Sequence, residues 1–600
     1  MRRETFVVLV PLALAGCYSM GLEPPDRPGP TDAGTGTPDA DAPIPSGLPA
    51  PTAARPAIAG GTLHVLADGR AVVGHPQHAA VSVVDGAAVV GSVPMPDGGV
   101  PGRITSDAAG RVHVVLTNRG ELVTLDPSGP SILARRHLCP EPRGVAVDGE
   151  RLHVACASGE LVTLPAAGGP ATRRLRLDDD LRDVVVQGDR LYVSRFRSAE
   201  LLTLDAEGRV IDRRSPQART VTASMRREPT RLTFVPNVAY RLRPLPDGGV
   251  AMLHQRSVVD PIDVGTDGYS GGGDDCPNGV VHAAITRFPP DGEPSAGGPI
   301  AFASLVVDFA LDAGGETYFM ASAALPHDVL PIPEVSGSVR SVAASSLDQP
   351  CLDVGPRMVS PEPSSAVELA PDGRVIALST DGDTLFVQPT RGAPMTLTVA
   401  GAIGPDPGFR LFHAATPAML ACASCHPEGA EDGFTWNFQP AGPRRTQTLT
   451  GGILDTAPFH WSGDQPGMRD IMQGTFTERM SAPFSSGDVD AIARWIDALP
   501  APAGDLRDAE AIARGEALFG GDAGCAGCHS GASLTDDLNH DVGTGEPFQT
   551  PSLVGVSYRA PFLHDGRAPT LEQTFVAGHG EAHRLGAEER RDLVTYLRSL

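Results

Sequence analysis

Several stretches in the first two-thirds of the chain repeat one alternation of apolar and polar residues. Each has an alternating segment, a short turn with glycine, and a second alternating segment, as in GVAVDGERLHVACASGELVTLP from residue 144, DVVVQGDRLYVSRFRSAELLTLD from 183 and VELAPDGRVIALSTDGDTLFVQP from 367. Alternation with period two puts every second side chain on one face of a strand, and a short glycine-containing turn joins antiparallel neighbours. The pattern therefore predicts β-hairpins.

The hairpin units recur along residues 56–400. Related turns occur at Asp68-Gly69, Gly110, Asp148-Gly149, Gly188-Asp189, Asp247-Gly248, Asp312 to Gly315 and Asp372-Gly373. Their spacing, roughly 40 residues at first and roughly 60 later, fits one four-stranded sheet of a radial repeat. We predict a multidomain chain that begins with an all-β propeller of about seven blades, with six or eight as alternatives.

After residue 400 the pattern changes to the helical period. Amphipathic or helix-like runs occur at 406–412 (DPGFRLF), 487–500 (GDVDAIARWIDALP), 510–519 (EAIARGEALF) and 586–600 (GAEERRDLVTYLRSL). Their apolar stripes are typical of helices that pack against a small core. We therefore predict two all-α domains, at 401–503 and 504–600.

The first residues have the pattern of an export signal. A positive start, an apolar run over residues 6–14 and LAGC at 14–17 resemble the signal and lipobox of bacterial lipoproteins, in which Cys17 is lipidated. An ordinary signal peptide with an incidental cysteine is the alternative. Residues 18–55 are rich in proline and small residues and predict a disordered linker. We expect an extracytoplasmic protein, in the periplasm or at the cell surface, anchored to the membrane by lipid.

Length and charge narrow the function classes. The chain has 600 residues and a formal net charge of -24. Nucleic-acid binding relies on lysine and arginine to neutralise phosphates, so this acidity argues against it. No segment after the signal has the ~20 apolar residues of a spanning helix.

Two pentads in the helical part carry the sharpest chemical signal. They are CASCH at 422–426 and CAGCH at 525–529. In C-x-x-C-H the thiols form thioethers to haem and the adjacent histidine lies on the iron axis. A redox dithiol does not require histidine twice at the same place, and a zinc ribbon has a different context. We predict two covalently bound haem c groups, held by Cys422, Cys425, Cys525 and Cys528, with His426 and His529 as proximal ligands.

Four of the nine cysteines belong neither to the lipobox nor to the pentads: Cys139, Cys156, Cys276 and Cys351. An even remainder in an oxidising compartment suggests disulfides. Cys139 and Cys156 flank a predicted turn, so we expect them to pair, and Cys276 to pair with Cys351 by elimination. Buried free thiols are the alternative.

The two helical domains correspond at a constant offset of 103 residues. This offset relates His426 to His529, the Ala-Pro-Phe at 457–459 to that at 560–562, and Gly463 to Gly566. It also places Met480 on His583. Methionine and histidine are common sixth ligands of haem iron, so Met480 is the expected distal ligand of the first haem. The alternatives there are Met468, Met472, Met419 and His460.

The second domain, 504–600, contains no methionine. Its distal ligand is expected to be His579 or His583, with His540, His564 and an open or water-filled position as alternatives. In the sheet region, His64, His75, His113 and His153 share no metal-ligand spacing, and two of them recur at similar places of successive units. We expect these four to be structural.

The pentads together with TPSLVGV, APFLHDGR, CASCHPEGAEDGFTW and APFHWSGD resemble the bacterial di-haem cytochrome c peroxidase and MauG superfamily over about residues 401–600. The resemblance implies that one haem receives electrons and passes them to a second, where peroxide is reduced. It also implies that a tryptophan between the haems can assist, and Trp461 is the candidate.

The chain departs from this family at the catalytic carboxylate. Family peroxidases carry a glutamate directly before the methionine, whereas here Arg479 precedes Met480 and Glu478 is displaced by one position. No histidine lies between His426 and His460. Assistance to O–O cleavage needs a side chain near the distal oxygen, so the displaced glutamate weakens the case for a peroxidase. Glu478 and Trp461 are the catalytic candidates.

The expected function is electron transfer by a di-haem c-type cytochrome. The redox partner would be a small cytochrome or a cupredoxin. The alternatives are an active di-haem peroxidase or oxidase that reduces hydrogen peroxide, and a propeller-based partner-binding or scaffold protein in which the haems have a supporting role.

Overall fold

The computed structural model describes residues 55–223, 230–265, 268–270, 276, 278–327, 337–352, 358–360, 362–401 and 403–600. The predicted signal peptide, the lipobox at Cys17 and nearly all of the predicted linker lie outside the described residues. Within the described ranges, no helix combines the length and apolar character that a membrane crossing requires.

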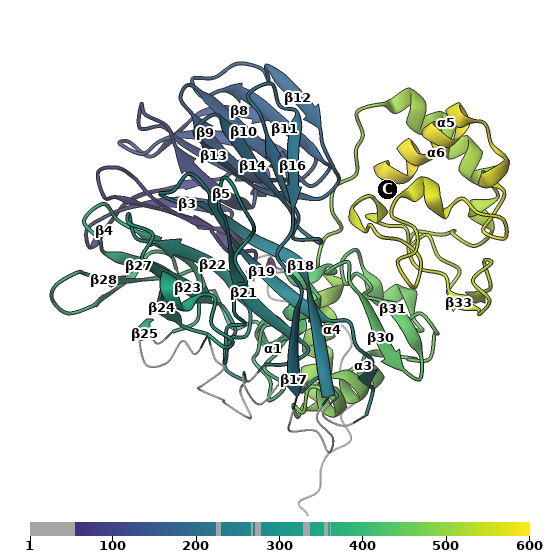
Figure 1. Cartoon of the computed structure of the whole chain (residues 1–600). Helices are drawn as coiled ribbons and strands as arrows, with labels where there is room; N and C mark the ends of the chain where they lie inside the picture. Colours follow the sequence, from purple (N-terminus) through teal and green to yellow (C-terminus); the bar gives the residue numbers. More distant parts are fainter. Residues whose placement is uncertain are drawn as a thin grey trace, which may run out of the picture. The chain divides into compact units, whose positions relative to one another are not determined.

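The described residues before 400 form seven four-stranded antiparallel sheets (Figure 1). The first sheet consists of β1 (Leu63–Val65), β2 (Ala71–His75), β3 (Ala80–Asp85) and β4 (Ala88–Pro94). The second consists of β5 (Pro101–Ser106), β6 (Val112–Leu116), β7 (Glu121–Asp126) and β8 (Ser131–His137). The third consists of β9 (Pro142–Asp148), β10 (Arg151–Cys156), β11 (Glu160–Pro165) and β12 (Arg173–Arg176). The fourth and fifth are β13 (Leu181–Gln187), β14 (Arg190–Arg195), β15 (Leu201–Leu204) and β16 (Val210–Arg214); and β17 (Arg219–Ala223), β18 (Thr230–Pro244), β19 (Val250–Val258) and β21 (Val281–Phe288). The last two are β22 (Val306–Leu311), β23 (Thr317–Ser322), β24 (Val339–Ala343) and β25 (Met358–Ser360); and β26 (Ser364–Leu369), β27 (Val375–Ser379), β28 (Thr384–Gln388) and β29 (Met395–Thr398).

The inner strands of successive sheets contact one another, in the order β1, β5, β9, β13, β18, β22 and β26. The series returns to its start, because β26 contacts β1 and the Gly61 N–H donates to the Ser365 carbonyl. The strand β6, next to the inner strand β5, is fully buried, whereas the outer strand β8 is largely exposed. The alternation predicted from the sequence thus belongs to a propeller-like arrangement of four-stranded sheets.

The repeated histidines join neighbouring strands. The His113 ring bonds to Thr124 (3.1 Å) and Asp107 (3.0 Å), and the His153 ring bonds to Thr163 (3.0 Å). The rings of His75 and His64 contact Ser82 and Ser106 in the same way. These histidines make hydrogen bonds within and between the sheets, which is the structural role that the sequence analysis expected of them.

The regular elements after residue 400 are mostly helices. The helices are α1 (Pro407–Phe412), α2 (Cys422–Cys425), α3 (Met468–Ile471), the π-helix η6 (Met472–Arg479), α4 (Ser486–Asp497), α5 (Ala509–Gly520) and α6 (Ala587–Ser599). The region is not all-α, however. A hairpin of β30 (Thr435–Gln439) and β31 (Gly442–Arg445) and a short pair, β32 (Asn539–His540) with β33 (Phe548–Gln549), were not predicted. The sequence TWNFQ at 435–439 has the aromatic and β-branched content that strands favour.

Two helix pairs cross at a glycine. A Cβ at Gly408 of α1 would lie 2.4 Å from the Ala491 carbonyl of α4, and one at Gly515 of α5 would lie 2.2 Å from the Asp592 carbonyl of α6. Such close backbone approach leaves no room for a side chain. The glycine in each short run, DPGFRLF and EAIARGEALF, is therefore a packing requirement.

The duplication predicted from the offset of 103 is visible in the backbone. An isolated bridge joins Phe459 to Gln465 in the first half and Phe562 to Ala568 in the second. The φ angles also match, with 63° at Gly463 and 70° at Gly566. The two halves therefore share one turn structure after each Ala-Pro-Phe.

The sheet region and the first helical region share one apolar core. It includes Phe309 and Ala324 from the sheets and Phe412 and Trp495 from the helices. At its edge, the Trp495 indole donates to the Arg55 carbonyl (3.0 Å), and the Arg55 guanidinium lies 3.7 Å from the Phe409 ring centroid.

His413 in this junction makes folding depend on pH. Its Nδ1 donates to the Phe409 carbonyl (2.8 Å) and its Nε2 accepts from the Ile58 N–H (3.3 Å), so the ring is neutral. Burial lowers the pKa of His413 to about 3. The unfolded chain therefore binds a proton that the folded chain does not, and stability falls as the pH drops below the ordinary histidine pKa. We expect wild type to lose about 2 kcal/mol more than His413→Gln between about pH 7 and about pH 5 in urea unfolding. Equal losses would contradict this, and exposed His78→Gln is the control.

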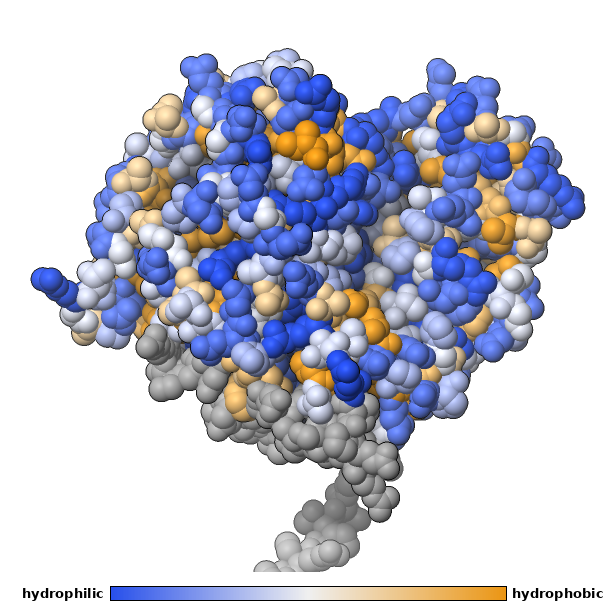
Figure 2. Space-filling model, in the orientation of Figure 1, coloured by the Kyte–Doolittle hydropathy of each residue, from blue (hydrophilic) through white to orange (hydrophobic). Residues whose placement is uncertain are grey.

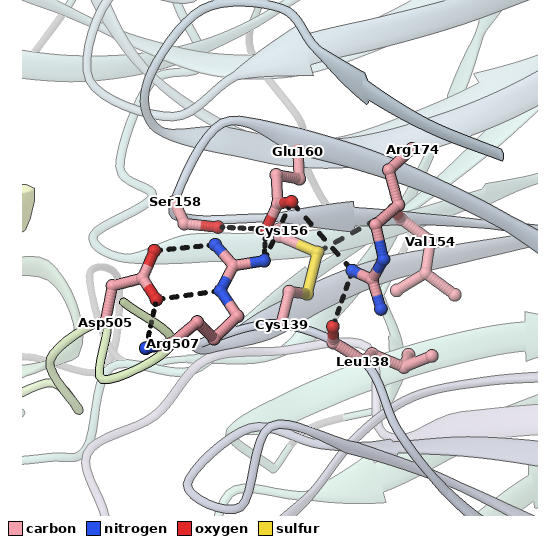
Figure 3. The surroundings of a disulfide bond; sticks show 9 residues. All are labelled: Leu138, Cys139, Val154, Cys156, Ser158, Glu160, Arg174, Asp505 and Arg507. Atoms are coloured by element: carbon pink, nitrogen blue, oxygen red, sulfur yellow. Dashed lines mark hydrogen bonds and ion pairs between the residues drawn. A yellow bond between two sulfur atoms is a disulfide. The ribbon is translucent and has the colours of Figure 1, made fainter. Parts of the chain in front are cut away.

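Two disulfides connect Cys139 with Cys156 and Cys276 with Cys351, the pairs that the sequence favoured. The first lies fully buried in the third sheet, beneath an ion-pair cluster (Figure 3). There Arg507, from the segment between α4 and α5, donates to Glu160 (2.9 Å) and to Asp505 (2.7 Å).

Removing the first disulfide is expected to destabilise the fold. It closes a loop of sequence separation 17, so Cys139→Ala with Cys156→Ala should cost about 3 kcal/mol in urea unfolding. The second disulfide spans a separation of 75, and its removal should cost about 4 to 5 kcal/mol. A smaller loss for the longer loop would contradict the chain-entropy explanation.

The surface in Figure 2 is mostly hydrophilic, with small separate hydrophobic patches. Exposed apolar residues such as Ile132, Leu133 and Ile211 lie singly or in pairs on the outer strands β8 and β16. Such scattered residues are normal for a globular surface and do not indicate a binding site.

Candidate functional site

The first pentad lies at the edge of a cavity in the helical region. Cys422 and Cys425 begin and end α2, and His426 follows directly. These side chains line a cavity of about 400 Å³ together with Met480. Neither cysteine is in a disulfide. The lining of the cavity therefore includes two free thiols and an imidazole.

The proximal histidine is oriented by the backbone. The Nδ1 of His426 donates to the Ala430 carbonyl (3.1 Å), which leaves Nε2 without a proton and able to bind a metal. Burial lowers the pKa of His426, so the imidazole is held neutral. The ring is in the state that an iron ligand requires.

The π-helix η6 also lines the cavity, through Met472, Phe476 and Arg479. Met480 follows the last residue of η6 and is 4% exposed. The described residues that line the cavity include its three rivals Met468, Met472 and His460, but not Met419. Single π-turns often occur at functional sites, because they shift the side chains that follow them.

Two buried and unpaired arginine N–H groups indicate what kind of group fits this cavity. Among the described residues, the Nε atoms of Arg445 and Arg479 are buried without a hydrogen-bond partner, and both residues line the cavity. An unpaired buried donor is unfavourable, and a guanidinium is best satisfied by a carboxylate. A haem carries carboxylates, thioether-forming vinyl groups and an iron. The apolar lining, two thiols, imidazole, methionine and arginine donors fit such a group.

The second pentad has a matching proximal histidine. Cys525 and Cys528 flank a single turn, and the Nδ1 of His529 donates to the Leu534 carbonyl (3.1 Å). Burial lowers the pKa of His529 to about 4. As in the first site, Nε2 is the free nitrogen.

His579 faces His529. The two ring centroids are 6.3 Å apart, and the Nδ1 of His579 donates to the Thr574 carbonyl (3.0 Å). With metal–nitrogen bonds of about 2 Å, two imidazoles on opposite sides of one metal ion have centroids about 6 Å apart. The pair therefore has the spacing and the free Nε2 atoms of two axial ligands.

The other three histidines of the second half do not face His529 in the way that His579 does. The His540 ring hydrogen-bonds to Asp536 (2.7 Å), and the His564 ring stacks on Phe548 with centroids 3.9 Å apart. The Nδ1 of His583 is buried without a partner among the described residues. Asp536 and His540 approach Cys528 to within 4.8 Å, but this set offers three ligands where structural zinc takes four.

The two catalytic candidates occupy different environments. Trp461 is buried, lines the first cavity and donates to the Arg445 carbonyl (2.7 Å). Its ring centroid lies 6.3 Å from that of His564 in the second half. Glu478 is exposed, accepts from Gln473 (3.2 Å) and does not line the cavity. The structure thus places Trp461, but not Glu478, at the site.

A buried acidic pair next to the first pentad was missed by sequence reasoning. Glu431 and Asp432 are 0% exposed. Burial raises the pKa of Asp432 to about 7, and its N–H donates to the Cys425 carbonyl (3.1 Å). Arg197 from the sheet region donates to the Glu431 carbonyl (2.9 Å). The acids in CASCHPEGAED were the available signal, but their partner Arg197 is far away in sequence.

The sheet region also contributes to the first cavity, which the sequence did not indicate. Val264, Tyr269 and Val280 line it. They follow β20 (Ile262–Asp263), which pairs in parallel with β30. Part of the segment between β20 and β21, residues 264–280, is therefore at the site, although 266, 267, 271–275 and 277 are outside the described residues.

Comparison with known proteins adds one sequence match. No protein-family model matches the chain. In the C-terminal part, 118 residues are 35% identical to the methylamine utilization protein MauG of Methylorubrum extorquens, a match that covers 14% of this chain and 33% of that protein. The chain thus spans about a third of the length of this relative.

Similar solved structures match the N-terminal region at low identity. Hydrazine synthase of Kuenenia stuttgartiensis is 16% identical, with 56% of this chain and 96% of that chain covered and a TM-score of 0.42. The β-propeller domain of Cps50 (Swd1) from Myceliophteria thermophila is 10% identical, with 54% and 94% covered and a TM-score of 0.36.

Proposed function

We propose that this chain is a di-haem c-type cytochrome that transfers electrons, similar to the di-haem peroxidases. The observation that carries the proposal is the paired arrangement at His529 and His579, whose Nε2 atoms are both free and whose rings are 6.3 Å apart. The repeated pentad and the similarity to MauG support it.

In this proposal the seven four-stranded sheets are the blades of a seven-bladed propeller, followed by two cytochrome c domains at 401–503 and 504–600. The continuous series of inner strands from β1 to β26 supports the blade count. The shared turn structure after each Ala-Pro-Phe supports two related domains.

The residues of each site would hold one haem in a different way. Cys422 and Cys425 would form the thioethers of the first haem, and His426 and Met480 would bind its iron. Cys525 and Cys528 would form those of the second, and His529 and His579 would bind its iron. A bound haem c accepts and donates single electrons, and its axial ligands set the potential. Met480 would raise the potential of the first site above that of the bis-histidine second site.

The protein orients and shields these groups. Backbone carbonyls of Ala430 and Leu534 fix the proximal rings, and the apolar core around Met480 excludes water from the first site. Trp461, between the first cavity and His564, bridges the two halves by aromatic contact. Electrons would pass between the sites along this contact.

Electron transfer is favoured over peroxide reduction because Glu478 lies on the surface. An acid or base must reach the reacting oxygen, and this carboxylate does not line the cavity. Electron transfer is also favoured over a purely scaffolding role, since both pentads retain complete ligand sets.

The redox partner in this proposal is a small cytochrome or a cupredoxin, and nucleic acid is not a partner. The protein would act outside the cytoplasm, in the periplasm or at the cell surface, held to the membrane by lipid on Cys17. The acidic composition favours a partner with a basic docking face.

Electron paramagnetic resonance of the oxidised, haem-loaded protein tests the function. We expect two low-spin signals that hydrogen peroxide leaves unchanged. A high-spin signal lost on adding peroxide would establish an open iron and favour the peroxidase alternative. Protein without covalent haem would contradict both.

A further inference from the structure

The first cavity has one wall that belongs to the sheet region. Tyr269 lies in the segment between β20 and β21, and its ring centroid is 6.4 Å from that of Phe438 on β30. Pairing of Ile262 with Phe438 ties the start of this segment to the helical region. The Val280 N–H donates to the Tyr269 carbonyl (3.1 Å) and ties its end to β21. The position of Tyr269 is thus determined from both sides.

Tyr269 holds Arg479 through its backbone, its hydroxyl and its ring. The Tyr269 N–H donates to the Arg479 carbonyl (3.1 Å), and Nη1 of Arg479 donates to the Tyr269 hydroxyl (3.3 Å). The guanidinium carbon lies 5.8 Å from the centroid of the Tyr269 ring and 5.5 Å from that of Phe438, within the range of cation–π attraction. These contacts restrict the conformation of the Arg479 side chain.

The remaining donor of Arg479 has no partner. Its Nε is buried and unpaired among the described residues, at a residue that lines the cavity. A guanidinium in such a place gains most from an anion, and a carboxylate is the anion that its planar fork fits. Glu478, next to it in sequence, is exposed and bonds to Gln473, so it does not supply that anion.

We propose that Tyr269 is a positioning residue of the first haem site, which holds Arg479 so that its Nε meets a carboxylate of the bound haem. The inference rests on the proposed function. It gives the sheet region a part in the redox chemistry, because Tyr269, which holds the arginine that compensates the haem carboxylate, lies between β20 and β21. Arg479 directly precedes Met480, so the same contact also fixes the end of η6 from which Met480 enters the cavity.

The test compares Tyr269→Phe, Arg479→Gln and the double variant in full-length, haem-loaded protein by spectroelectrochemistry. Arg479→Gln removes a positive charge beside a haem carboxylate, so it should lower the midpoint potential of one haem and leave the other unchanged. Tyr269→Phe keeps the ring but loses the hydroxyl, and should lower the same potential by less. Because Tyr269 acts through Arg479, the double variant should not differ from Arg479→Gln.

The control is Tyr318→Phe, at a buried tyrosine of β23 that does not line the cavity and whose hydroxyl has no partner among the described residues. It should leave both potentials unchanged. The inference is overturned if Tyr269→Phe has no effect, if the two single shifts add in the double variant, or if Arg479→Gln shifts neither haem. Covalent haem is counted first in the wild type: fewer than two per chain contradicts the proposed function, whereas two per chain with unresponsive potentials contradicts only the inference.

Discussion

Replacing Cys525 and Cys528 with alanine should lower the covalent haem content from two groups per chain to one. Both thiols are free, and thioether bonds are the only covalent link that the second site offers. The intact mass of the variant should be lower than that of wild type by one haem, after correction for the two lost sulfur atoms. Its absorbance per chain should fall to about half.

The matched variant, Cys422→Ala with Cys425→Ala, should lose the other haem and give the same mass difference. Cys139→Ala with Cys156→Ala is the control, because that pair forms a disulfide, and it should retain both haems. An unchanged mass in either pentad variant would exclude haem c at that pentad. Stoichiometric zinc in the purified wild type would support a metal-binding reading of the pentads instead.

Replacing His579 with alanine should convert the second haem from a low-spin to a high-spin state. His579 is the described histidine whose ring faces His529, and its Nε2 is free. Without it, that iron would lose its sixth ligand, and a high-spin signal should appear in electron paramagnetic resonance. Added imidazole should restore the low-spin signal, because it supplies the same donor atom.

His583→Ala is the matched control for this experiment. His583 is the residue onto which the offset of 103 maps Met480. The substitution His583→Ala should leave the low-spin signal intact. A high-spin signal in His583→Ala, with none in His579→Ala, would assign the distal ligand to His583 and contradict the geometry.

The offset of 103 shows where sequence reasoning succeeds and where it stops. It correctly relates Gly463 to Gly566, because both belong to one tight turn whose backbone tolerates no insertion. Beyond that turn the first half continues into the π-helix η6, whereas the second half has two short 3-10 helices, Leu571–Thr574 and Ala582–Arg584, before α6. A difference in helical type changes the rise per residue, so the mapping of Met480 onto His583 does not carry over to the position opposite His529.

Local pattern predicted the elements better than it predicted their contacts. The four-stranded units and the helices around residues 487–500 and 586–600 follow from periodicity that each segment carries alone. The pentads are equally local. The placement of Tyr269 against Arg479 is not, because it depends on a pairing between Ile262 and Phe438 that no short segment records.

Glu478 illustrates the same limit at the level of a single side chain. The sequence places Glu478 one residue away from the family's catalytic position, and it does not show in which direction the side chain points. In η6 the neighbour Arg479 points toward the cavity and Glu478 toward solvent, because adjacent residues of a helix occupy different faces.

The wall that Tyr269 provides has a consequence for the order of assembly. The second site draws its thiols, both imidazoles and their carbonyl partners from residues 525 to 579, so it can close by local folding. The first site needs a segment that precedes its pentad by more than a hundred positions, and contacts at such separation form late. During maturation, the second haem would be enclosed first, and the first would stay accessible until the sheets are complete.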